Sequence, residues 1–198
     1  FLNDIANMIP ELKKTKKRVP SLSPNNTAVA LWIEIGSARI LLGSDLEETG
    51  KPSTGWSAIV QSEDRPQGQA SIFKIPHHGS QTGHHDQVWE EMIDKSRIAV
   101  LSPWYLGGNV LPTTRDIERI ISFASDSYIT TYKLPPKSKK TRPSAVERTI
   151  RETVGKLKVV EPSMGWVSLR NGGKDSPDKW GVELSHVGIK LSDLAISA

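Results

Sequence analysis

Cysteine is absent from this chain of 198 residues. Its absence excludes disulfides, thiolate metal sites and a cysteine nucleophile, so any bound metal must be held by histidine, aspartate or glutamate. No apolar run reaches the 18 residues typical of a membrane span, and no charged-then-apolar segment of the secretory type opens the chain. We therefore expect a cytoplasmic protein that does not associate with membranes.

Apolar residues are also sparse, at 36% of the chain, which is typical of a folded domain with sizeable polar loops. The length allows one domain with a substantial core and is too short for two comfortable ones. The net charge of +4 is concentrated in two basic clusters, one within residues 13–18 and one within residues 137–142. Such clusters attract phosphate backbones through counterion release, but they also occur as solvated loops, and both interpretations remain open.

Short apolar segments alternate with turns and with helical patterns, which predicts a layered α/β fold. The turn Gly36-Ser37 predicts a hairpin between the first two strands. Thr113 or Thr114 can cap the clearest of the helices. The expected strands cover residues 27–35, 40–42, 71–75, 98–101, 128–132 and 166–169, with a further strand at Val159, and the expected helices cover residues 87–93, 113–124 and 144–154.

One candidate for chemistry is Asp45, at the end of the apolar segment that contains Leu41 and Leu42. A carboxylate at the carboxyl end of a strand is held by the rigid sheet and faces its open edge, where metal ligands are useful. The same residue could instead cap a turn.

The second candidate is the segment His77-His78-Gly79-Ser80, which follows the next predicted strand. Neutral imidazole is the commonest nitrogen ligand of zinc, and the following glycine gives access. Adjacent histidines point in different directions, so we expect one to bind metal while the other orients it or meets substrate. A histidine-rich surface loop is the alternative. Nearby, His84 and His85 form either a substrate-facing loop or solvated neighbours of a helix cap at Asp86.

Together these segments resemble metallo-β-lactamase-fold proteins related to the hydrolase domain of the ComEC-type competence proteins. The resemblance covers roughly residues 25–132. It implies an α/β fold in which residues 1–132 form the C-terminal half of an αββα sandwich, with residues 133–198 as an appendage packed on the same domain. The segments that carry it are 25–29, 36–47, Gly55-Trp56, Lys74 to Ser80, 99–103 and 108–112.

The resemblance also implies roles for individual residues. Asp45 matches the position that bridges metals, with one extra residue between it and Gly43. Asp45, His77 and His78 would be the catalytic and metal-binding residues, holding one or two zinc or manganese ions. Ser80 would contact an anionic substrate. From its place one residue before the strand ends, Lys74 is a further candidate to contact a phosphate, and an exposed strand lysine is the alternative. From its place after a strand that ends at the same edge, Trp104 is a candidate to stack a base or line the pocket.

Two departures from the family pattern shape the expected function. The main metal motif, His-x-His-x-Asp-His, does not occur in this chain, and Leu111 stands where relatives often carry histidine before Pro112. The chain also begins with Phe1. We expect a metal-dependent hydrolase, a nuclease or phosphodiesterase, whose N-terminal half comes from a companion chain or a preceding segment. A half sandwich would expose an apolar sheet face and be insoluble or tightly paired when alone.

Two other functions remain open. The first is a degenerate, non-catalytic module of the same fold that binds nucleic acid or a protein partner. The second is a hydrolase of small esters or thioesters, which a deep apolar pocket would indicate.

Overall fold

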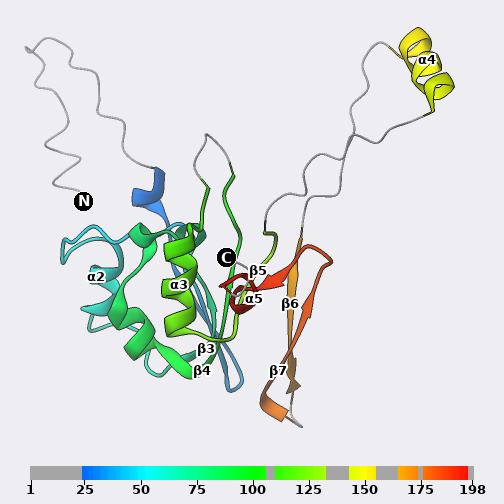
Figure 1. Cartoon of the computed structure of the whole chain (residues 1–198). Helices are drawn as coiled ribbons and strands as arrows, with labels where there is room; N and C mark the ends of the chain where they lie inside the picture. The colour runs from blue at the N-terminus through cyan, green and yellow to red at the C-terminus, as the bar shows by residue number, and fades with distance from the viewer. Residues whose placement is uncertain (1–23, 106–109, 133–142, 155–164, 174–175, 196–198) are drawn as a thin grey trace, which may run out of the picture.

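The structure, a computed structural model, describes residues 24–105, 110–132, 143–154, 165–173 and 176–195. Both basic clusters and the strand predicted at Val159 lie outside these residues. The described strands form a six-stranded sheet and a separate two-stranded hairpin (Figure 1). Their bounds are β1 (Leu31–Ile35), β2 (Ala38–Leu42), β3 (Ala70–Lys74), β4 (Ile93–Leu101), β5 (Ser127–Ile129), β6 (Val167–Gly172), β7 (Ser176–Leu184) and β8 (Ile189–Lys190).

The centre of the larger sheet is parallel, which decides where candidate site residues meet. Its strand order is β1-β2-β3-β4-β5-β8, and β2, β3, β4 and β5 pair in parallel. The two edge strands, β1 and β8, are antiparallel to their neighbours. Because the carboxyl ends of parallel strands lie at one edge, the segments that follow β2, β3 and β4 lie side by side there. The predicted α/β class is confirmed.

The helix predicted most clearly, over residues 113–124, is present in the structure. Helix α3 (Thr114–Phe123) is capped by Thr113, whose hydroxyl accepts from the Asp116 amide while the Asp116 carboxylate accepts from the Thr113 amide. Among the described residues, no helix is long and apolar enough to cross a membrane. The others are α2 (Gly55–Val60), α4 (Ser144–Thr153) and α5 (Leu191–Ala195), with short turns η1 (Pro24–Thr27), η2 (His77–Gly79), η3 (Gln81–Gly83) and η4 (Val88–Met92).

Several predicted boundaries differ from the structure. The helix expected over residues 87–93 is a single π-helical turn, η4, and β4 begins at Ile93 instead of Ile98. Ile93 is fully buried and pairs with Ala70, so packing against β3 outweighs the helical pattern. The strand expected from Thr27 starts only at Leu31, because Thr27 closes η1. Helices α2 and α5 and strands β7 and β8 were not predicted.

The tail of the chain belongs partly to the main sheet. Strand β8 pairs with β5 through Tyr128 with Lys190 and Ile129 with Ile189. Leu191, directly after β8, is completely buried in the main core. The last described residues of the predicted appendage are therefore an edge of the sheet.

Helices cover one face of the sheet and build the core there (Figure 1). Leu41, Phe73 and Ala99 face it from three adjacent strands. The Phe73 ring makes edge-on contacts with Trp56 and Trp89, at centroid distances of 6.4 and 4.8 Å. Aromatic packing of this kind supports the two strands that carry the site residues.

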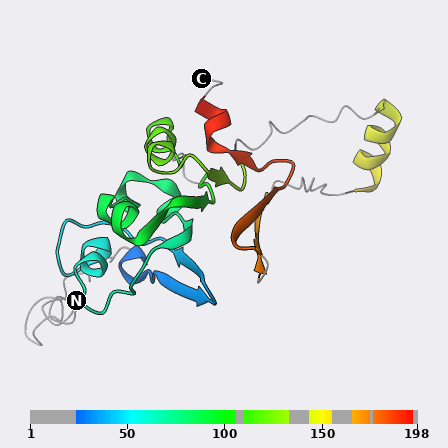
Figure 2. The same ribbon diagram turned by 90° about the horizontal axis from the view of Figure 1, so that it is seen from below.

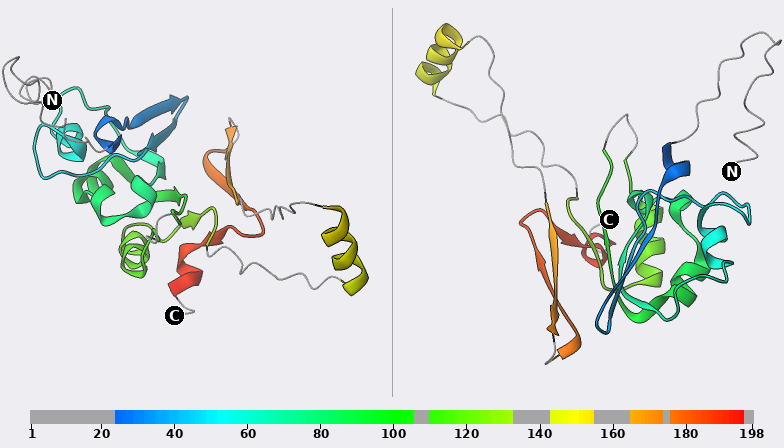
Figure 3. Two further views of the ribbon diagram at one scale, coloured as in Figure 1. Left: turned by 90° about the horizontal axis from the view of Figure 1, so that it is seen from above. Right: turned by 180° about the vertical axis from the view of Figure 1, so that it is seen from behind.

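The opposite face of the sheet carries exposed apolar side chains near β1. Ala28, Ala30 and Trp32 pack against the core, while the residues that alternate with them point away from it. Of these, Leu31 is 51% exposed and Ile35 is 69% exposed. Figures 2 and 3 show the β6–β7 hairpin on this side, standing apart from β1 and β2.

Candidate metal and substrate site

Asp45 and His78 come together at the carboxyl edge of the parallel strands. Asp45 follows β2 and His78 follows β3, and the Asp45 Oδ1 atom lies 3.7 Å from the His78 Nε2 atom. His78 Nδ1 lies 3.0 Å from the carbonyl oxygen of Ser102, which follows β4. A neutral His78 ring that donates Nδ1–H to this carbonyl presents the Nε2 lone pair toward Asp45. Metal-binding histidines are commonly oriented by a hydrogen bond of this kind.

The backbone around the pair adopts an uncommon conformation. Ser44, His77 and His78 have φ values of 48°, 43° and 55°, in the left-handed region that non-glycine residues rarely occupy. Each such residue costs about 1–3 kcal/mol and persists only where the surroundings enforce it. Here the His77 amide donates to the Ser44 carbonyl at 3.0 Å, which ties the two strand ends together. Strain of this type concentrates at functional sites.

His77 points to different partners from its neighbour. Its Nδ1 atom lies 3.0 Å from Glu47 Oε1 and 2.8 Å from Thr82 Oγ1, and its Nε2 atom lies 3.3 Å from Asn25 Nδ2. The rings of His77 and His78 are 6.2 Å apart and tilted by 54°. Because protein groups contact both ring nitrogens of His77, His78 is the better placed of the two to bind a metal.

Ser80 and Lys74 lie at the same edge but make intramolecular contacts. Ser80 Oγ accepts from the Thr82 amide at 3.3 Å and so caps the turn η3. Lys74 is not the exposed strand lysine that one interpretation allowed, because its Nζ atom donates to the Ile75 carbonyl at 3.3 Å and is partly buried. Burial lowers the pKa of Lys74, and the nearby Asp45 carboxylate partly offsets that effect. The substrate roles of both residues stay predictions.

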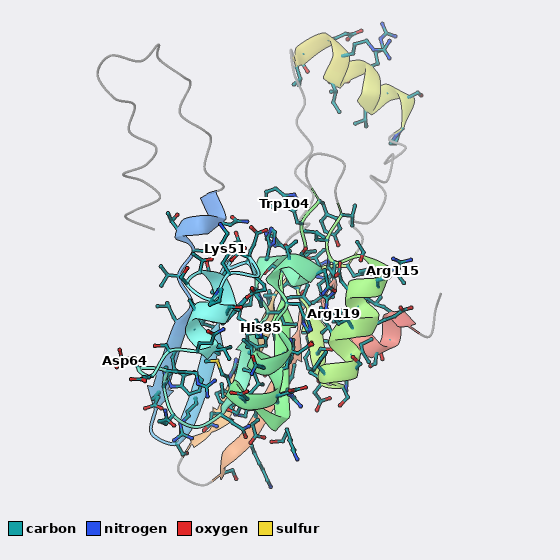
Figure 4. All side chains as sticks on the ribbon, turned by 90° about the vertical axis from the view of Figure 1, so that its left-hand side faces the viewer. Lys51, Asp64, His85, Trp104, Arg115 and Arg119 are labelled. Carbon is teal, nitrogen blue, oxygen red and sulfur yellow. The ribbon has the colours of Figure 1, made fainter. Side chains whose placement is uncertain are left out.

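Trp104 lies beside His78 and remains accessible. The two ring centroids are 5.2 Å apart with a tilt of 38°, and Trp104 is 41% exposed. Figure 4 shows Trp104 at the end of the molecule where the segments following the parallel strands lie. Trp104 can therefore contact a molecule bound at Asp45 and His78.

His84 is an interior residue, so the interpretation of solvated histidines is wrong for it. Only 9% of its side chain is exposed, and its ring lies against Phe123 at 5.1 Å. Trp89 Nε1 donates to its Nδ1 atom at 3.1 Å, while Nε2 lies 2.7 Å from Asp86 Oδ1. This pattern needs the neutral ring with its hydrogen on Nε2. His85 contacts neither Asp45 nor His78 directly, and its Nε2 atom lies 4.0 Å from Glu48 Oε2.

Protonation of His84 is expected to destabilise the fold. Burial is the main cause that lowers its pKa; Arg119 and His85 lower it further, and Asp86 opposes them. The unfolded chain therefore binds this proton more readily, and stability should fall as the pH drops below about 6.5, the ordinary value for histidine. Urea midpoints between pH 5 and 8 test this, with His84→Gln flattening the slope and the exposed His186→Gln leaving it unchanged. An unchanged slope in His84→Gln would assign the pH dependence to another group.

Arg119 anchors the histidine segment to α3, a contact that the sequence did not suggest. Its guanidinium donates to the Gly79 carbonyl at 2.6 Å, to the Gln81 side-chain oxygen, and to the Asp116 carboxylate at 2.7 Å. Burial would raise the pKa of Asp116, but hydrogen bonds from Thr113 and Arg119 outweigh it and hold that pKa below its ordinary value. The helix cap and the site loop thus share one network.

The donor set at this edge fits part of a metal site. Asp45 and His78 provide oxygen and nitrogen donors that zinc and manganese accept, whereas catalytic zinc sites use three protein ligands. Within the described ranges, no three histidine, aspartate or glutamate side chains are grouped to hold a metal ion.

A pocket of about 330 Å³ lies elsewhere in the fold. Trp32, Ile59 and Met92 are among the residues that line it, and none of the candidate site residues does.

Comparisons with protein-family models, with curated proteins and with solved structures find no match to this chain.

Proposed function

We propose that this chain is one half of a metal-dependent hydrolase, a nuclease or phosphodiesterase, and that a companion chain or preceding segment completes its site. The observation that carries the proposal is the pair at the sheet edge, in which the Asp45 Oδ1 and His78 Nε2 atoms are 3.7 Å apart. Half of a catalytic metal site requires side chains that can bind the metal, with at least one of them held in orientation. Here two such side chains follow neighbouring parallel strands, and the Ser102 carbonyl orients His78.

In this proposal Asp45 and His78 would hold zinc or manganese. The ion supplies Lewis acidity, which makes a water nucleophile available near neutral pH. His77, held between Asn25 and the Glu47–Thr82 pair, would keep its segment in place beside the substrate. The partly buried ammonium of Lys74 would add positive charge near a phosphate group, because electrostatic stabilisation works best where water is excluded.

A completing half accounts for the apolar sheet face as well. Val29, Leu31 and Ile35 are all more than half exposed on the side that the helices leave open. Packing a second layer there would remove this surface from water at a gain of roughly 25 cal/mol per Å². The fold would then be the αββα sandwich that the sequence resembles, with the remaining metal ligands entering from the new layer.

Metal binding by the complete protein should depend on Asp45 and His78. Isothermal titration with zinc is expected to show binding in the wild type and a loss of affinity of at least tenfold in Asp45→Asn or His78→Ala, since even residues behind the ligands affect affinity by 10–100-fold. Asp64→Asn and His186→Ala are matched controls, because both residues are exposed and neither forms an ion pair with Asp45 or His78. Figure 4 places Asp64 far from Trp104. A folded wild type without zinc or manganese affinity would contradict the proposal.

A second candidate is a non-catalytic module of the same fold that binds nucleic acid or a protein. It is favoured by the grouping of only two metal donors among the described residues and by Leu111 before Pro112. Turnover of a phosphodiester by the metal-loaded complete protein separates the two functions, because the module would bind without cleaving.

A further inference from the structure

The backbone of Trp104 is held in place by a pair of hydrogen bonds to Leu111. Its amide donates to the Leu111 carbonyl at 2.8 Å, and the Leu111 amide donates to the Trp104 carbonyl at 2.9 Å. These two reciprocal hydrogen bonds hold Trp104 in place. Only Ser102 and Pro103 separate it from the end of β4. Val110, next to Leu111, is 55% exposed. A large aromatic ring is thus presented to solvent from a constrained backbone, which reduces the entropy lost when a ligand binds it.

The Trp104 ring also lies next to the Asp45–His78 pair. Trp104 lies beside His78 at a centroid distance of 5.2 Å, and His78 in turn faces Asp45. A flat group that stacks on the accessible part of Trp104 would lie next to the Asp45–His78 pair. Because an indole ring offers a wide π surface and one hydrogen-bond donor, it suits a ring-shaped ligand group better than a small ester.

Two exposed cations lie on the same end of the molecule. Lys51 belongs to the connection after β2, and Arg115 belongs to the first turn of α3. Figure 4 shows Lys51, Arg115 and Trp104 toward the same end of the molecule. Neither side chain forms an ion pair with another described residue, so both are available to an incoming anion. Single-strand binding grooves combine exposed cations of this kind with an accessible aromatic ring.

We propose that Trp104 stacks a base of single-stranded nucleic acid, with Lys51 and Arg115 contacting phosphates of the same strand. The proposal rests on the proposed function for its choice of a phosphodiester substrate, and it narrows that substrate to a strand with unpaired bases. A base inside a duplex is already stacked on its neighbours and offers no face to Trp104. Stacking on an aromatic ring tolerates any base, so the expected binding has little sequence preference.

Binding without cleavage tests this directly. Fluorescence anisotropy of a labelled oligothymidylate of about ten nucleotides, a length within single-strand site sizes, is measured with the full chain in a metal-free buffer. Trp104→Ala is expected to weaken binding by about 5- to 150-fold, the equivalent of losing one stacked base. Trp104→Phe should restore most of the affinity. The matched control is Trp166→Ala, because Trp166 is 51% exposed just before β6 and makes no ring contact with His78.

The probes also separate stacking from charge. An abasic strand of the same length should bind weakly and equally to wild type and Trp104→Ala, while Lys51→Ala and Arg115→Ala should weaken both strands and reduce the salt dependence. Equal affinity of wild type and Trp104→Ala for oligothymidylate would overturn the proposal. A loss of assembly with a companion chain, without a loss of strand binding, would instead assign Trp104 to a protein contact. Because no metal is added, failure of the hydrolase proposal leaves this result unaffected.

Discussion

Gly43→Ala is expected to lower the free energy of unfolding by about 3 kcal/mol, at the upper end for overpacking a core. A Cβ atom at this position would lie 2.8 Å from Pro76 Cβ and 2.9 Å from the Lys74 carbonyl oxygen. The Pro76 ring and the Lys74 backbone are both rigid, so neither can easily move aside for the added atom. The Gly43 amide also donates to that same carbonyl at 2.9 Å, so the two strand ends cannot separate without breaking a hydrogen bond.

Urea denaturation measures this effect, and Gly181→Ala is its control. At Gly181 the nearest atom to an added Cβ is the Arg170 carbonyl oxygen at 3.8 Å, an ordinary contact. Alanine there should be neutral or slightly stabilising, because it reduces the freedom of the unfolded chain. A wild-type urea midpoint in Gly43→Ala would mean that β2 and β3 are less closely packed at their carboxyl ends than described.

Asp116→Ala is expected to cost about 3–5 kcal/mol, the range for removing one partner of a buried ion pair. Asp116 is 4% exposed and accepts from the Thr113 amide at 2.9 Å, the Thr113 hydroxyl at 2.6 Å and Arg119 at 2.7 Å. Its loss removes the carboxylate half of the α3 capping box and leaves the Arg119 guanidinium without its carboxylate. Thermal or urea unfolding at pH 7 gives the measurement.

The double variant Asp116→Ala/Arg119→Met identifies the source of that cost. It should be more stable than Asp116→Ala, because no uncompensated charge remains, although the contact to Gly79 is lost. The pKa of Asp116 is below the ordinary value for aspartate, so its contribution is present above about pH 3.9 and is lost as the pH falls through the lowered value. A double variant that is less stable than the single one would show that Arg119 stabilises chiefly through Gly79 and Gln81.

Local signals predicted much of the fold, because the features concerned depend on neighbouring residues. Gly36-Ser37 between two apolar segments predicted the β1–β2 hairpin, and a cap at Thr113 or Thr114 predicted the start of α3. Strand β8 has only two residues and no periodicity, so its pairing with β5 depends on a distant part of the chain. The early start of β4 likewise depends on Ala70 and the core beneath it.

The candidate site was likewise predictable only where it depends on neighbouring residues. Strand-end positions suggested Asp45 and the histidine pair, and the parallel order of β2 and β3 places Asp45 beside His78. Sequence spacing could not indicate which histidine faces Asp45, because that depends on the left-handed backbone at both residues. Nor could it indicate that Arg119 reaches back to Gly79, forty positions earlier. Such contacts are set by tertiary packing, which leaves no local pattern.

The pairing of Ile129 with Ile189 makes everything between them an insertion between two adjacent strands, even though it contains α4 and the β6–β7 hairpin. The entropy of closing an insertion grows only with the logarithm of its length, by about 0.6 kcal/mol for each doubling. Evolution can therefore lengthen, shorten or exchange this stretch at small thermodynamic cost. Residues 189–191 have no such freedom, because Leu191 is completely buried and β8 borders β5. The domain therefore includes these residues and does not end where the inserted stretch begins.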